Sequence, residues 1–124
     1  MKKILFLDDR RNPFEKDWKD WIFKYGSTEN IENYEVVWVK SFKAFTDWIT
    51  ENGLPIEIFF DHDISDFTGV DGTELRGIDC AKWLVEYCLD NNLSMPPYAI
   101  QSSNYDGREN IDGLLKSFVK NVKQ

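Results

Sequence analysis

The chain has 124 residues, of which 42% are hydrophobic, and a formal net charge of −7 at pH 7. A chain of this length buries roughly two thirds of its unfolded surface, so residues 1–124 are expected to form one domain. The negative charge argues against a protein that coats duplex DNA, because such binding needs many lysines and arginines to neutralise phosphates. No apolar run is long enough to span a membrane, and the aspartates near the start do not fit a signal peptide, so we expect a cytoplasmic protein without membrane contact.

The hydrophobic pattern predicts four strands that alternate with four helices. The predicted strands are Lys3–Leu7, Tyr34–Val39, the apolar start of Ile56–Ile64, and Tyr98–Gln101. The predicted helices are about Phe14–Tyr25, a segment capped by Ser41 that ends near Gly53, about Gly77–Asn91, and a last segment capped by Asn104 or Asp106. A βαβαβαβα order predicts an α/β fold with a parallel sheet between two helical layers. The expected strand order is 2-1-3-4, a flavodoxin-like winding shortened by one strand.

Two of the predicted strands end in aspartates. Asp8 and Asp9 follow the first strand, and Asp61 and Asp63 follow the third. In the order 2-1-3-4 these strands are neighbours at the switch point, where open α/β sheets bind ligands. Carboxylates at such spacing raise one another's pKa, so a divalent cation or a phosphate group would keep them charged. Because the ligands are oxygens, all four aspartates are candidate ligands of Mg²⁺ or Mn²⁺ rather than zinc.

A divalent cation at this edge favours phosphoryl chemistry, because it polarises phosphoryl oxygens and lowers the pKa of a bound water. His62 is the only histidine of the chain and lies between two aspartates. It is therefore a candidate proton donor or acceptor. The candidate catalytic residues are Asp61, His62 and Asp9.

Candidate phosphate ligands come from the arginines and from the start of the last predicted helix. Each arginine alone is as readily a solvated surface residue. As a set they lie beside the acidic strand ends, which favours anion binding. The hydroxyl groups that follow the fourth strand, together with backbone amides of the next helix, suit a phosphate oxygen. The candidates are Arg10, Ser102, Ser103, Asn104 and Arg108.

The longest irregular segment is Ser65–Arg76, which contains several acidic residues and glycines. Its ligand spacing does not fit a calcium-binding loop. Two interpretations remain open for it, an acidic surface loop and a lid over the site.

Three motifs carry a family resemblance: LDDRRNP at residues 7–13, DHDI at 61–64 and QSSNYDG at 101–107. Together they resemble the cyclic-phosphate processing receiver domains, whose pattern is LDD-x-R-x-P, DHD and HS-x-N-P-x-G. The resemblance spans nearly the whole chain. Compared with an ordinary receiver domain of two-component signalling, the chain lacks the fifth strand, with its lysine, and the fifth helix.

The resemblance to receiver domains of two-component signalling implies that Asp8 and Asp9 hold Mg²⁺, that Asp61 occupies the phosphoacceptor position, and that Ser102 stands at the Ser/Thr position of receivers. The resemblance to the cyclic-phosphate processing family implies action on cyclic phosphates, such as the 2′,3′-cyclic ends of RNA or nucleotides. Two residues depart from the family pattern. Gln101 stands where the pattern has histidine, and Tyr105 where it has proline.

The leading hypothesis is therefore a metal-dependent cyclic phosphodiesterase whose partner is a nucleotide or RNA terminus. Two hypotheses of other classes remain. One is a degenerate receiver that acts by protein contact or aspartyl phosphorylation, and the other is a module that sequesters a nucleotide without turnover. An exposed Trp38 or Trp83 would mark a homodimer face, although core packing is the preferred interpretation of both residues.

Overall fold

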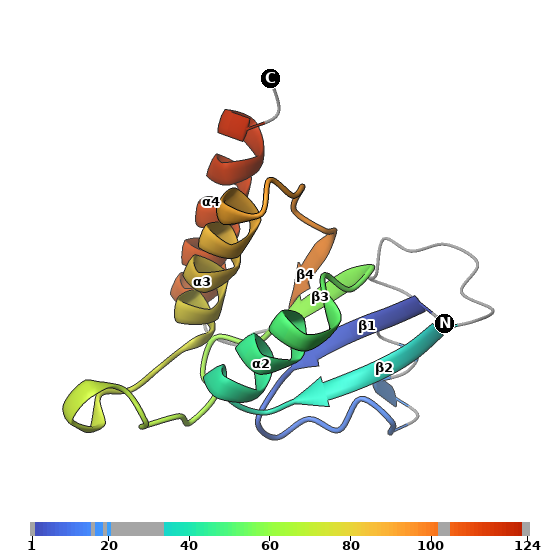
Figure 1. The fold of residues 1–124 in the computed structure, drawn as a ribbon. Helices are drawn as coiled ribbons and strands as arrows, with labels where there is room; N and C mark the ends of the chain where they lie inside the picture. The colour runs from blue at the N-terminus through green and yellow to red at the C-terminus, as the bar shows by residue number, and fades with distance from the viewer. Residues whose placement is uncertain (1, 16, 19, 21–33, 102–104, 123–124) are drawn as a thin grey trace.

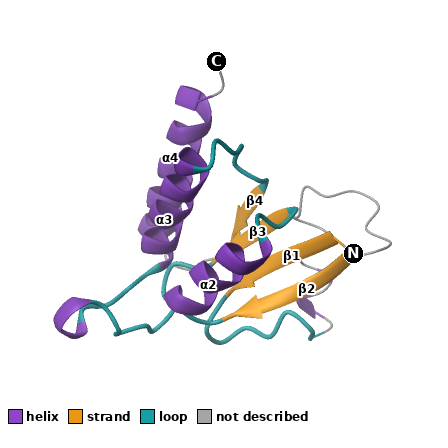
Figure 2. Ribbon diagram, viewed as in Figure 1, coloured by secondary structure: helices purple, strands orange, loops and turns teal. Residues whose placement is uncertain are grey.

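A computed structural model describes residues 2–15, 17, 18, 20, 34–101 and 105–122. Its sheet has four parallel strands in the order β2-β1-β3-β4, which confirms the predicted order and the receiver-like α/β fold (Figures 1 and 2). The strands are β1 (Lys2–Leu7), β2 (Tyr34–Val39), β3 (Glu57–Phe60) and β4 (Tyr98–Ile100). The helices with complete bounds are α2 (Phe42–Asn52), α3 (Gly77–Asp90) and α4 (Tyr105–Val122), with a short 3₁₀ turn, η1 (Val70–Gly72). The described residues 17, 18 and 20 are helical as well.

The predicted boundaries agree with these elements to within a residue or two. One predicted helix cap is wrong, because α4 already begins at Tyr105 and Asp106 therefore lies inside its first turn. The alternative cap, Asn104, lies outside the described residues. The helix predicted at Phe14–Tyr25 also extends into residues that the structure does not describe, so the second helical layer that it would supply is not tested.

The main core lies between the sheet and the helices α2, α3 and α4, which all pack on the same face (Figure 2). The fully buried side chains of this core include Leu5, Leu7, Phe45, Ile49, Ile58, Phe60, Leu84, Ile111 and Leu115. A second cluster on the opposite face contains Ile4, Phe6, Val36 and Phe59. Because successive side chains of a strand point to opposite faces, burial on both faces explains why β1 and β3 are continuous apolar runs.

Helix starts follow from local sequence. Ser41 caps α2 as predicted, because its hydroxyl oxygen accepts a hydrogen bond from the backbone N–H of Ala44 at 3.1 Å. Gly53 ends this helix with φ of 84°, a backbone conformation that favours glycine. At the start of α3, the carboxylate of Asp79 accepts a hydrogen bond from the backbone N–H of Arg76 at 2.7 Å.

The strand register sets which residues meet at the carboxyl edge of the sheet. Phe6 of β1 lies opposite Phe59 of β3, and Phe60 lies opposite Ile100 of β4. If this register continues past the ends of the strands, Asp8, Asp61 and Gln101 fall in one row. Residues that are far apart in the sequence therefore converge at this edge. In the part of the chain that the structure describes, no helix has the length and apolar character needed to cross a membrane.

Candidate functional site

Three aspartates form an acidic cluster at the carboxyl ends of β1 and β3. Asp8, Asp9 and Asp61 each offer a carboxylate oxygen, and these oxygens lie within 4.8 Å of one another. Asp8 is fully buried and Asp61 is 4% exposed, whereas Asp9 is partly exposed. The structure thus brings together three of the four aspartates that the sequence suggests as metal ligands.

The loop after β1 folds back around the carboxylate of Asp8. Its Oδ1 accepts hydrogen bonds from the backbone N–H groups of Arg10 and Arg11, both at 2.9 Å. Its Oδ2 accepts a hydrogen bond from the guanidinium of Arg11 at 3.0 Å. The indole N–H of Trp38 donates to the backbone carbonyl of Asp8 at 2.7 Å. These four bonds fix the position of Asp8 before any ligand arrives.

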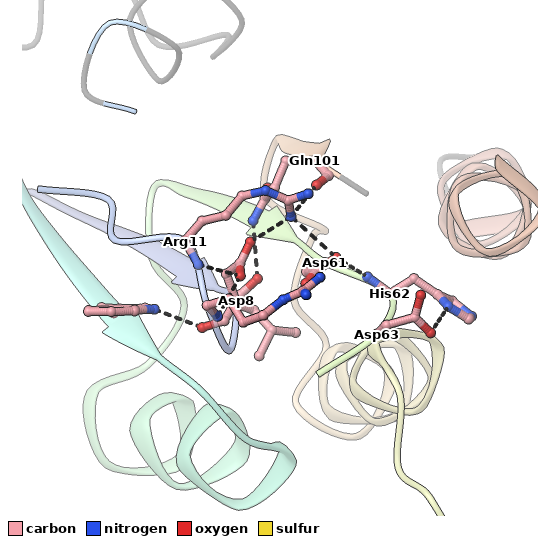
Figure 3. A network of polar contacts seen from close by, with 9 residues as sticks. Asp8, Arg11, Asp61, His62, Asp63 and Gln101 are labelled. Carbon is pink, nitrogen blue, oxygen red and sulfur yellow. Dashed lines mark hydrogen bonds and ion pairs between the residues drawn. The ribbon is translucent and has the colours of Figure 1, made fainter. Parts of the chain in front are cut away.

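Arg11 is the cation of this network and was not among the predicted phosphate ligands (Figure 3). Besides Asp8, its guanidinium approaches Asp61 Oδ1 at 3.7 Å and donates to the backbone carbonyl of Gln101 at 3.0 Å. It also lies 5.3 Å from the centre of the Trp18 ring, which suits a cation–π contact. The predicted residue, Arg10, is exposed and meets the cluster through its backbone. The spacing LDD-x-R-x-P, applied to LDDRRNP, points to position 11 and is the signal that could have identified Arg11.

The pKa of the Asp61 carboxyl group lies well above its usual value. Burial, followed by the neighbouring Asp8 carboxylate, raises the pKa of Asp61 to about 7. The Arg11 guanidinium and a hydrogen bond from the backbone N–H of His62, at 2.9 Å, oppose this rise. The cluster is therefore short of positive charge, even with the arginine in place.

The donor set fits a divalent cation. All three side chains supply oxygen, the ligand type that Mg²⁺ and Mn²⁺ prefer. In addition, Oδ1 of Asp9 is buried and has no hydrogen-bond partner among the described residues. A buried carboxylate oxygen without a partner is costly, and a cation would satisfy it.

His62 and Asp63 lie apart from the acidic cluster. The ring of His62 is directed away from Asp8 and Arg11, and its Nδ1 lies 3.0 Å from Oδ1 of Asp63 (Figure 3). The side chain of Asp63 is 53% exposed. A Cβ atom added to Gly107 would lie 2.2 Å from Cγ of His62, so the first turn of α4 packs directly on the ring.

The start of α3 is packed just as closely on the acidic turn. A Cβ atom on Gly77 would lie 1.9 Å from the backbone oxygen of Asp61. The N–H of Gly77 also donates to the backbone carbonyl of His62 at 2.7 Å. Glycines at the first turns of α3 and α4 therefore hold the segment that follows β3.

The remaining predicted phosphate ligands are not part of the described cluster. Ser102, Ser103 and Asn104 lie outside the described residues. Arg108 is exposed and lines a separate pocket of about 350 Å³ between β4 and α4, with its guanidinium 5.9 Å from the centre of the Tyr105 ring.

The segment Ser65–Arg76 extends away from the sheet and helices (Figure 1). It is anchored by the buried Asp66, whose carboxylate accepts hydrogen bonds from the backbone N–H groups of Phe42 at 2.9 Å and Thr68 at 3.1 Å. Its exposed apolar residues are Phe67 and Val70. In this structure the segment is an anchored, projecting loop.

The fold and the site together define a receiver-like domain with an acidic cluster at the ends of β1 and β3. The family model described as the cyclic-phosphate processing receiver domain matches residues 3–117, and the chain belongs to this family. The family name associates the domain with the processing of cyclic phosphates.

Comparison with solved structures supports the fold. A fusion protein that carries the yeast Spc42 trimeric coiled coil is similar to this chain, with a TM-score of 0.57 and 17% sequence identity. The match covers 98% of this chain and 76% of the fusion chain. At this identity the likeness shows a shared fold alone. No match was found among curated proteins.

Proposed function

We propose that this domain hydrolyses cyclic phosphates, such as the 2′,3′-cyclic phosphate ends of RNA or nucleotides, with the help of Mg²⁺ or Mn²⁺. The observation that carries the proposal is the cluster of Asp8, Asp9 and Asp61, whose oxygens lie within 4.8 Å of one another. Membership of a family named for cyclic-phosphate processing supports the choice of substrate.

In this proposal the three aspartates hold the cation. Asp8 is already oriented by two backbone N–H groups, and Asp9 supplies a buried oxygen that lacks a partner among the described residues. A bound divalent cation would polarise a phosphoryl oxygen and lower the pKa of a water molecule. It would also hold Asp61 in the ionised form, which burial otherwise disfavours.

Arg11 is the proposed phosphate ligand of the cluster. Without a cation, its guanidinium compensates the charge of Asp8 and Asp61. A cation that binds these carboxylates would neutralise their charge in place of Arg11. The guanidinium could then donate hydrogen bonds to two oxygens of a phosphate group. Its side chain is 25% exposed, so a ligand from solvent can reach it. The predicted residues Arg10, Ser102, Ser103, Asn104 and Arg108 remain further candidates for phosphate contacts.

His62 is the proposed proton carrier. If Asp63 accepts the proton of Nδ1, then Nε2 is the basic atom of the ring. The role requires the ring to rotate from its present direction toward the acidic cluster. Because Gly107 packs closely on the ring, this packing determines the free energy that the rotation requires.

The test is product formation from a nucleoside 2′,3′-cyclic phosphate, followed by anion-exchange chromatography. We expect a monophosphate in the presence of Mg²⁺ and none with a chelator or with the Asp9→Asn variant. Asp106→Asn is the matched control, because Asp106 is an exposed aspartate outside the acidic cluster, and it should retain full activity. Equal product formation with and without the cation would contradict the proposal.

A second candidate function is capture of a nucleotide without turnover. It is favoured by the direction of the His62 ring and by Gln101, an amide that cannot transfer protons, at the position where the family pattern has histidine. Calorimetry would show Mg²⁺-dependent binding of the cyclic nucleotide, and the nucleotide would be recovered unchanged. Formation of a monophosphate would exclude this alternative.

A further inference from the structure

Gln101 lies at the carboxyl edge of the sheet, directly after β4. It is 5% exposed, and its backbone N–H donates to the carbonyl of Phe60 at 2.8 Å, which extends the contact between β3 and β4 by one residue. The register therefore places Gln101 in the same row as Asp61 and Asp8.

The side chain of Gln101 reaches across the end of β3. Its Nε2 donates to the backbone carbonyl of Leu7, in β1, at 3.1 Å. β3 separates β4 from β1, and neighbouring strands lie about 4.8 Å apart. To reach Leu7, the side-chain amide must therefore extend past Asp61, the residue that follows β3 in the same row. Only the nitrogen of the amide can donate to a carbonyl, so this bond also fixes which of its atoms is Oε1.

Oε1 is the one polar atom of Gln101 for which the described residues offer no partner. It is buried and makes no hydrogen bond, whereas the backbone N–H, the backbone carbonyl and Nε2 are all engaged. A buried acceptor without a donor is unfavourable. The hydrogen bond to Leu7 therefore does not explain why Oε1 is buried without a donor.

We propose that Oε1 of Gln101 is a further ligand-binding atom of the acidic site, which accepts a hydrogen bond from a water molecule of the hydrated cation. The inference rests on the proposed cation site of Asp8, Asp9 and Asp61. Mg²⁺ usually keeps several of its waters when a protein binds it, and these waters need acceptors. Gln101 would act as a positioning residue that orients such a water, without adding charge and without exchanging protons.

The test measures Mn²⁺ binding by electron paramagnetic resonance and thermal unfolding in a chelator, for the wild type and two variants. Gln101→Met removes both Oε1 and the donor to Leu7, whereas Gln101→Glu keeps an oxygen but loses the donor. We expect Gln101→Met to weaken Mn²⁺ binding by about tenfold, the usual size of such effects. Gln101→Glu should bind Mn²⁺ at least as tightly as the wild type, because it adds a carboxylate to the cluster.

The outcomes separate this inference from the proposed cation site. If the two variants weaken Mn²⁺ binding equally, the bond to Leu7 explains the effect and the role of Oε1 is refuted. The role is also refuted if both variants bind Mn²⁺ like the wild type while Asp9→Asn does not. If the wild type itself binds no Mn²⁺, the cation site fails and the inference fails with it.

Discussion

The ionised form of Asp61 is expected to destabilise the cation-free protein at neutral pH. Burial and the Asp8 carboxylate raise the pKa of Asp61 from 3.8 to about 7. The folded protein therefore keeps a proton that the unfolded chain releases near pH 4, so stability falls as the pH rises from about 4 to about 7. With about 1.4 kcal/mol per pKa unit, the upper limit is about 4 kcal/mol, and solvent screening reduces our expectation to about 2 kcal/mol.

The variant Asp61→Asn tests this reasoning, because it removes the ionisable group but keeps an oxygen that can accept the hydrogen bond from the backbone N–H of His62. In a chelator, the variant should exceed the wild type in unfolding free energy by about 2 kcal/mol at pH 8 and by little at pH 4. Urea unfolding, followed by tryptophan fluorescence, measures both values. The exposed control Asp106→Asn should show no such gain. A difference that does not change with pH, or an Asp61→Asn protein less stable at pH 8, would refute the argument.

Two further pairs of variants test the packing and the charge balance of the site by urea unfolding in a chelator. Gly107→Ala places a Cβ atom 2.2 Å from Cγ of His62 and should cost about 1–3 kcal/mol. By contrast, Gly113→Ala should stabilise α4 by about 0.5–1 kcal/mol, because no atom of the described residues lies within 4 Å of the new Cβ atom. Equal effects of the two substitutions would show that the ring is not held by α4. Arg11→Gln leaves a buried carboxylate without its guanidinium and should cost about 2–4 kcal/mol, while the exposed neighbour Arg10→Gln should change stability by less than about 0.5 kcal/mol. A larger loss of stability from Arg10→Gln than from Arg11→Gln would contradict the assignment of Arg11 as the counterion of the cluster.

Much of the fold could be predicted from the sequence, because its strands are short apolar runs separated by turn residues and helical segments. The alternation of strands and helices requires a parallel sheet, which then brings the ends of β1 and β3 together. For this reason the amino-acid sequence alone was enough to assign Asp8, Asp9 and Asp61 to one cluster.

Residues beyond the strand ends were harder to place. β3 ends at Phe60, so the alternation of a strand no longer indicates where Asp63 points, and this side chain lies apart from the cluster. The ring of His62 packs against Gly107, a distant residue whose contact no local pattern reveals.

Which of two adjacent arginines joins the site could not be predicted from their charge. Arg10 and Arg11 carry the same charge at adjacent positions, so composition and charge cannot distinguish them. The turn that brings two backbone N–H groups onto Asp8 also carries the side chain of Arg11 back to the cluster. In the sequence, this choice is visible only in the spacing of the family pattern.

Phosphorus NMR of a nucleoside 2′,3′-cyclic phosphate, incubated with the protein and Mg²⁺, tests the central claim most directly. Hydrolysis predicts that the resonance of the cyclic phosphate is replaced by that of a phosphate monoester. The change should be absent with a chelator and with Asp61→Asn. A cyclic-phosphate resonance that persists unchanged, while Mg²⁺ is bound to the protein, would contradict the proposed hydrolysis.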